Sequence, residues 1–181
     1  MKAVLISIRP QWCEKITSGE KTIEVRKSAP KEVPFKAYIY MTKKKPYMLT
    51  FAGNGKMRVH NGMVIGEFIC DRVEVFTPSE HGIRFKRFRA LYETCLTVTE
   101  MREYANGKPV YGWHISNLKV YDKPKELSEL WGRKNCLAAH TVECWNCFAA
   151  CREINGKHYQ PLRRPPQSWC YIEETALWTN K

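Results

Sequence analysis

The stretch that decides the fold is TSGEKTIEVRK, residues 17–27, which places five charged side chains in eleven residues. Ile23 and Val25 alternate with polar residues, and this period of two is typical of a β-strand with one apolar face. Glu24 and Arg26 then share the other face of the strand. The stretch therefore predicts a strand that buries its apolar side and gathers charged groups on the opposite side.

The start of this strand controls where Lys21 points. Gly19 suits the position just after a helix, where the chain turns sharply. If that turn rotates the chain, Lys21 and Glu24 share one cleft at about 3–6 Å, the range in which charges shift each other's pKa. A cleft-lining Lys supports no core, so Lys21→Ala is expected to abolish ligand binding or turnover at little cost in stability. The alternative is an exposed ion pair of Glu24 with Arg26, worth about 0–1 kcal/mol and without function.

Composition favours a soluble protein with a polyanionic partner. The 181 residues suit one domain, and 44% of them are hydrophobic. Thirty Lys and Arg residues against 18 Asp and Glu residues give a net charge of +12. Such an excess favours RNA or DNA as a partner through release of counterions. A basic surface without any partner has the same composition.

The sequence shows neither a secretory signal nor a membrane span. The apolar run after Lys2 is too short for a signal and is broken by Arg9-Pro10. We therefore expect a cytoplasmic protein that does not enter membranes. Its eight cysteines are then reduced thiols, metal ligands or packing residues, not a disulfide framework.

Periodicity predicts an α+β fold. Strand patterns cover residues 2–8, 17–27, 36–42, 63–76 (with a bulge at Gly66), 110–121 and 168–174, and an exposed hairpin or loop excursion covers 43–62. Helical patterns cover residues 9–19, 83–93 and the segment from the capping box Thr97–Glu100 to Gly107. This order favours a small, mostly antiparallel β-barrel with short flanking helices, interrupted by a Cys-rich insertion at about 123–161.

Two short segments echo each other, RPQWC at 9–13 and RPPQSWC at 164–170. Aromatic rings beside guanidinium and amide groups are what a single-stranded base needs for stacking and hydrogen bonding. Trp12 lies on an apolar helix stripe and is assigned to the core, while Trp169 at a strand start is assigned to a cleft. Core packing of both tryptophans is the alternative. The candidate ligand-binding residues are Arg9, Arg26, Arg164, Gln167, Ser168 and Trp169.

Further basic residues occur in two clusters. RFKRFR at 84–89 interleaves Arg and Lys with phenylalanines, and Lys43, Lys44 and Lys45 are consecutive. Together they can form a surface that follows phosphates. A solvated basic face of an amphipathic helix has the same pattern.

Four cysteines fall within sixteen residues, Cys136, Cys144, Cys147 and Cys151. Thiolates at CxxC spacing can share one structural Zn²⁺, which would hold together an insertion that has few core residues. Because only one true CxxC is present, a helix with buried thiols is the alternative. No other cofactor is expected.

Taken together, SIRPQWCEKITSGEKTIEVRK, MVIGEF and RPPQSWCYIEE resemble the ASCH domain family, relatives of the PUA RNA-binding fold. The family motif Gly-x-Lys-x-x-Glu-x-Arg corresponds to Gly19, Lys21, Glu24 and Arg26. The resemblance covers roughly residues 1–120 and 160–175. It implies a PUA-like barrel whose cleft faces RNA or a nucleotide-like ligand. Some members of the family resemble ribonucleases.

One branch of the family hydrolyses acetylcytidine with a Lys, a Thr and a Glu. Lys21 matches the Lys, whereas Glu24 occupies the position of the Thr, so the hydroxyl nucleophile is missing. Glu93 is the nearest candidate for the acidic partner.

Two functions therefore stand as hypotheses. The first is an RNA- or nucleotide-binding protein with a basic cleft built from residues 7–26 and 163–169. The second is a hydrolase acting on RNA or a modified nucleoside, with Lys21 as base or nucleophile and Glu24 or Glu93 as acid or base.

Overall fold

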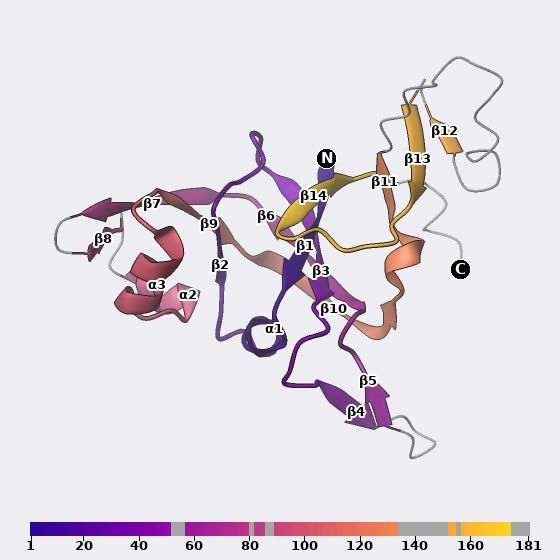
Figure 1. Ribbon diagram of the computed structural model, residues 1–181, viewed down its shortest axis with the longest axis horizontal. Coiled ribbons are helices and arrows are strands. Elements are labelled where there is room, and N and C mark those ends of the chain that lie inside the picture. The colour runs from indigo at the N-terminus through magenta and orange to yellow at the C-terminus, as the bar shows by residue number, and fades with distance from the viewer. Residues whose placement is uncertain (52–56, 80–81, 86–88, 134–151, 155–156, 175–181) are drawn as a thin grey trace.

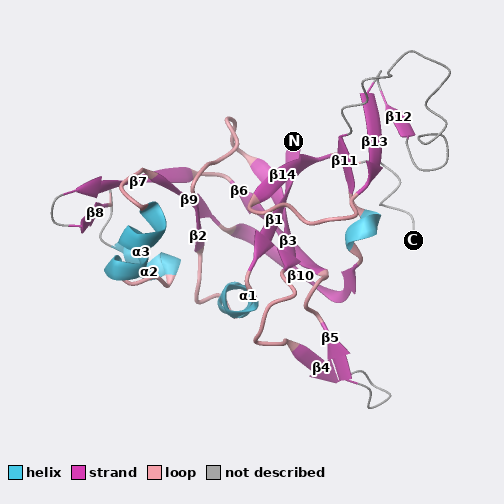
Figure 2. Cartoon of the chain, in the orientation of Figure 1, coloured by secondary structure: helices cyan, strands magenta, loops and turns pink. Residues whose placement is uncertain are grey.

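A computed structural model of the chain describes residues 1–51, 57–79, 82–85, 89–133, 152–154 and 157–174. These residues form fourteen strands, three short α-helices and one 3₁₀ turn, so the protein is mostly β with few helices (Figure 2). None of the helices described is long and apolar enough to cross a membrane.

The larger sheet has five strands in the order β10-β6-β3-β1-β14 (Figure 1). Their bounds are β1 Lys2–Ile8, β3 Phe35–Met41, β6 Val64–Cys70, β10 Ser116–Lys125 and β14 Trp169–Ile172. β1 and β3 run parallel, and the other neighbours in this sheet are antiparallel. Helix α1, Pro10–Thr17, lies between β1 and β2 in the chain and has Pro10 in its first turn, as the sequence predicts.

The second sheet has four strands in the order β2-β9-β7-β8. Their bounds are β2 Ile23–Arg26, β7 Val73–Ser79, β8 Gly82–Arg84 and β9 Val110–His114. The predicted alternation in β2 is confirmed. Ile23 and Val25 pack into an apolar cluster with residues of α2, Arg89–Thr94, and α3, Val98–Ala105. Glu24 and Arg26 therefore lie on the opposite side of the strand.

Two predicted long strands are each two strands that belong to different sheets. Residues 63–76 divide into β6 and β7 at Asp71 and Arg72, and residues 110–121 divide into β9 and β10 at Ile115. The two breaks lie together, because the His114 amide donates to the Arg72 carbonyl at 3.0 Å. The ladders formed by the described strands leave both sheets open, so this part of the chain does not form a closed barrel.

Gly66 marks the predicted bulge in β6. Ile39 of β3 pairs with Gly66 and Tyr40 pairs with Val64, so one residue of β6 is left over in the ladder. A Cβ at Gly66 would lie 2.5 Å from the Lys119 carbonyl oxygen of β10. Glycine is therefore required where the two strands approach.

Three apolar clusters hold the layers together. One face of the five-stranded sheet packs against α1 and Trp113 of β9, with the Phe35 and Trp113 ring centroids 4.9 Å apart. The other face packs against Leu127 and Leu130 in and beside the 3₁₀ turn Leu127–Glu129. The third cluster joins the four-stranded sheet to α2 and α3. Helices α2 and α3 are thus at one end of the molecule and the 3₁₀ turn is at the other (Figure 1).

The segment predicted as a helix at 83–93 is partly wrong. Residues Gly82–Arg84 form β8, which pairs with β7, and the helix α2 begins only at Arg89. Pairing with β7 thus places Ile83 and Arg84, the first two residues of the predicted helix, in a strand. The predicted hairpin at 43–62 is confirmed as β4 Leu49–Phe51 and β5 Met57–Val59. The remaining strands, β11 Trp131–Arg133, β12 Arg152–Ile154 and β13 Lys157–Pro161, form a separate three-stranded sheet.

The capping box at the start of α3 is confirmed. The Glu100 amide donates to the Thr97 hydroxyl at 3.2 Å, and the Thr97 amide donates to the Glu100 carboxylate at 2.8 Å. We expect Thr97→Ala to lower the free energy of unfolding by about 1 kcal/mol at neutral pH, measured by urea denaturation. Thr99→Ala, in the exposed first turn of the same helix, is the control. Equal midpoints for the two variants would contradict the capping contact.

The same contact makes the stability depend on pH. The hydrogen bond from the Thr97 amide lowers the pKa of Glu100 below its ordinary value. Because the folded pKa lies below the unfolded one, the contribution is present above about pH 4.3 and disappears as the pH falls through the folded pKa. The difference in the free energy of unfolding between wild type and Glu100→Gln should therefore become smaller as the pH falls from about 4.3 through the folded pKa of Glu100.

Candidate functional site

Lys21 is buried directly after the turn at Gly19, which has a φ of 80°. Its amide donates to the Lys15 carbonyl at 2.8 Å, so the chain folds back on α1 before β2 begins. Its ammonium donates to the Thr94 carbonyl at 2.6 Å and lies 3.4 Å from the Glu24 carboxylate. The predicted proximity of Lys21 and Glu24 is confirmed.

Glu24 lies between two cations. The Arg26 Nη2 atom is 2.9 Å from Glu24 Oε1, while Lys21 faces the other carboxylate oxygen. We call Lys21, Glu24 and Arg26 the buried charge cluster, because their side chains are only 2%, 7% and 10% exposed. Two cations and one anion leave it with a formal excess of one positive charge. Among the residues that the structure describes, Arg26 Nε is buried without a hydrogen-bond partner.

Apolar and aromatic groups surround the cluster. Lys21 Nζ lies 5.2 Å from the centroid of the Trp12 ring, a cation–π distance. Burial raises the pKa of the Cys13 thiol, and the Glu24 carboxylate adds to this shift. Trp113 is the cross-strand partner of Glu24. In surroundings of this kind charged groups interact more strongly than in water, so the contacts within the cluster fix its geometry.

A larger cavity of about 810 Å³ lies beside the cluster, and we call it the basic pocket. Its walls come from the ends of β1 and β3, the 3₁₀ turn and the loop before β14. Charged groups at the pocket are three cations, Lys43, Arg163 and Arg164, and one carboxylate, Glu126. The lining residues are Ser7, Tyr40, Thr42, Lys43, Gly62, Glu126, Leu127, Ser128 and 162–167.

Ser7 connects the cluster to the pocket. Arg26 Nη2 donates to the Ser7 carbonyl at 2.7 Å, and the Ser7 hydroxyl donates to the Pro166 carbonyl at 2.6 Å. The Ser7 amide donates to the Ser168 carbonyl at 2.9 Å. The hydroxyl and the amide of Ser7 therefore hold the loop that carries Arg163 and Arg164. The Ser7 carbonyl bonds Arg26 of the buried charge cluster.

The structure brings some of the predicted ligand-binding residues to the pocket and places others elsewhere. Arg164 and Gln167 line the pocket, and Ser168 contributes its carbonyl to Ser7. Trp169 is only half-buried, with its ring centroid 5.6 Å from that of Trp113 and its indole N–H donating to the Ser28 hydroxyl at 3.1 Å. Arg9 is exposed at the start of α1.

Glu93 approaches the cluster through its backbone. Its carbonyl accepts from the Thr22 amide at 3.0 Å, and the next residue, Thr94, accepts from Lys21. The Glu93 carboxylate lies 3.8 Å from Arg89 Nε, one turn earlier on α2.

Four pocket residues were not among the predicted site residues, namely Ser7, Arg163, Thr42 and Glu126, although Ser7 and Arg163 lie in the two segments predicted to build the cleft. Ser7 had a detectable signal, since it is the polar residue within an otherwise apolar strand run, AVLISI. Thr42 follows β3, and its hydroxyl is buried without a partner among the residues that the structure describes. Glu126 has no sequence signal, because only the fold brings the 3₁₀ turn beside the loop at 162–167.

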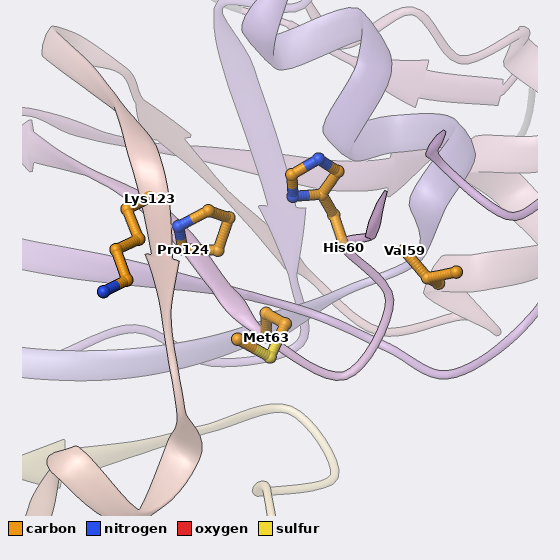
Figure 3. Close-up of a pocket in the computed structure, with 5 residues that line it drawn as sticks. All are labelled: Val59, His60, Met63, Lys123 and Pro124. Carbon is orange, nitrogen blue, oxygen red and sulfur yellow. The ribbon is translucent and has the colours of Figure 1, made fainter. Parts of the chain in front are cut away.

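A second cavity, of about 130 Å³, lies between the hairpin and β10. Val59 and His60 lie on one side, Lys123 and Pro124 on the other, with Met63 between them (Figure 3). It is smaller than the roughly 300–1,000 Å³ typical of organic ligand sites. The basic pocket is therefore the better candidate for a ligand.

The predicted zinc ligands, Cys136, Cys144, Cys147 and Cys151, lie outside the described residues. Within the described ranges, no group of three or more Cys, His, Asp and Glu side chains is arranged to hold a metal ion.

Comparison with known proteins identifies the fold. The sequence matches no protein-family model and no curated protein. The structure is similar to the crystal structure of the ASCH protein from Zymomonas mobilis, with a TM-score of 0.56 at 18% identity over 96% of this chain and 89% of that one. Two single-substitution variants of the same protein give TM-scores of 0.54 at 16% and 17% identity, over 96% of this chain and 92% and 89% of theirs. The chain thus has an ASCH-like fold.

The burial of Lys21 corrects the expectation that its removal costs little stability. Lys21→Ala leaves the buried Thr94 carbonyl without this donor and takes one of two cations from Glu24. We expect it to lower the free energy of unfolding by about 1–3 kcal/mol in urea denaturation. Lys108→Ala, at an exposed position after α3, should change it by less than about 0.5 kcal/mol. If both variants unfold at the wild-type midpoint, the Lys21 contacts contribute nothing.

Proposed function

We propose that this protein binds single-stranded RNA or a nucleotide-like ligand in the basic pocket. The observation that supports this most strongly is the pocket itself, in which Lys43, Arg163 and Arg164 face one volume of about 810 Å³. Guanidinium and ammonium groups are the side chains that bind phosphate best. The net charge of +12 adds a long-range attraction for a polyanion.

The pocket also offers groups suited to a base and a sugar. Gln167 supplies an amide, Ser128 supplies a hydroxyl, and Pro165 and Leu162 supply apolar surface. Single-stranded RNA presents stacking faces, base edges and 2′-hydroxyls, which such a mixed lining can bind together with phosphate. The ASCH-like fold is consistent with this proposal and does not identify the ligand.

Hydrolysis of RNA or a modified nucleoside is the second candidate. It is favoured by the 3.4 Å separation of the Lys21 ammonium and the Glu24 carboxylate, a buried acid–base pair. In this function Lys21 acts as base or nucleophile and Glu24 or Glu93 as acid or base. It requires the ligand to reach past Ser7, because the described lining of the basic pocket includes Ser7 but not Lys21.

The binding proposal is tested by titrating a single-stranded RNA at about 50 mM and about 200 mM salt. Wild-type affinity should fall steeply with salt. The double variant Arg163→Ala/Arg164→Ala should bind more weakly and with a shallower salt dependence, by about 0.7 in the logarithmic slope for each lost phosphate contact.

The matched control removes the same charge from another part of the surface. Arg102 and Lys108 are exposed in and after α3, at the other end of the fold. Arg102→Ala/Lys108→Ala should keep the wild-type slope of the logarithm of affinity against the logarithm of salt concentration. Equal losses in both double variants would mean that only the overall charge matters, and undetectable binding at low salt would reject the proposal. Conversion of the RNA by wild type but not by Glu24→Gln would favour the hydrolase.

A further inference from the structure

The loop between β3 and β4 carries a dense set of exposed cations. Residues 42–48, which we call the lysine loop, include Lys43, Lys44 and Lys45, and all three are exposed. Tyr47, two residues later, is 54% exposed. The loop thus presents three ammonium groups and one aromatic ring to solvent.

The Asn61 side chain bonds this loop at several points. The Asn61 amide nitrogen donates to the Lys44 carbonyl at 2.6 Å and to the Pro46 carbonyl at 3.1 Å. The Asn61 side-chain oxygen accepts from the Met48 amide at 2.9 Å. The backbone that carries the lysines and Tyr47 is therefore fixed at several points, which reduces the entropy lost when a ligand binds.

The lysine loop begins at the basic pocket. Lys43 lines the pocket, and its side chain crosses Gly62, where a Cβ would lie 2.9 Å from Lys43 Cε. Gly62 has a φ of 89° and also lines the pocket. Tyr47 lies four positions after Lys43, so their Cα atoms are at most about 14 Å apart. A strand that extends a few nucleotides beyond the pocket can therefore contact both places.

The hairpin beyond the loop adds exposed apolar surface. Leu49 of β4 pairs with Val59 of β5, and the two residues are 45% and 49% exposed. An exposed ring and apolar groups beside lysines are the pattern of proteins that bind single strands by stacking and by neutralising phosphate. The adjacent positive charge favours a polyanion over an uncharged protein partner.

We propose that the lysine loop is a second contact surface for single-stranded RNA, on which Tyr47 stacks with a base and Lys44 and Lys45 neutralise phosphates. The proposal rests on the proposed function of the basic pocket and extends it. The ligand is then a strand that leaves the pocket past Lys43 and continues along the loop, rather than a free mononucleotide.

Length dependence separates the two proposals. A trinucleotide and a decanucleotide of the same base are titrated into wild type, Tyr47→Ala and Tyr92→Ala at one low salt concentration. Tyr92, on α2 and 66% exposed, is a matched control for the loss of an exposed ring. We expect wild type to bind the decanucleotide more tightly, and Tyr47→Ala to lose roughly 5- to 100-fold of that affinity while its trinucleotide affinity is unchanged.

Lys44→Ala/Lys45→Ala should lower the decanucleotide affinity and reduce its salt dependence, again without changing trinucleotide binding. If wild type and Tyr47→Ala bind both lengths equally, the loop is not a contact surface and the pocket proposal survives. If wild type binds neither length, the pocket proposal fails. If Tyr47→Ala and Tyr92→Ala lose affinity equally, the specific role of Tyr47 is rejected.

Discussion

The constraint on which this structure depends is the carboxylate of Glu24, which is buried between Lys21 and Arg26. A carboxylate removed from water is costly unless cations and donors surround it, and removal of one partner from such a group is strongly destabilising. The chain meets this requirement by a turn at Gly19, a strand that places Glu24 and Arg26 on one side, and a carbonyl from Thr94 that holds Lys21. Three separate parts of the chain are thereby fixed at one point.

The cluster also shapes the surface above it. Arg26 holds the Ser7 carbonyl, and Ser7 holds the loop at 163–168 through its hydroxyl and its amide. The exposed arginines of that loop are thus attached to a rigid base, although the loop itself has no regular structure. Arg26 is thus linked to the pocket through Ser7, although the described lining of the pocket does not include Arg26 itself.

The sequence was informative where local pattern decides structure. The alternation in β2, the helix end at Gly19, the capping box at Thr97 and the hairpin at 43–62 depend on neighbours in the chain, and each is confirmed. Arg164 and Gln167, two of the predicted ligand-binding residues, line the basic pocket together with Ser7, and their role in binding a ligand stays a prediction.

Pattern could not reveal where a strand leaves one sheet for another. The sequence predicted one continuous strand at 63–76 and another at 110–121, because both halves of each segment form strands with the pattern of a β-strand. The chain changes sheet at Arg72 and at Ile115, and neither place has a glycine or proline that would signal a break. The same limit concealed the burial of Lys21 and the place of Glu126, since both follow from contacts between distant parts of the chain.

We infer that Arg26 and the basic pocket act as one unit through Ser7. A double-mutant cycle of Ser7→Ala and Arg26→Lys, read as the affinity for a single-stranded RNA, tests it most directly. We expect that each variant weakens binding and that the two effects are coupled by about 1 kcal/mol or more, because both substitutions interrupt the contacts that join Arg26 to the loop at 163–168. Effects that add to within about 0.5 kcal/mol would contradict it.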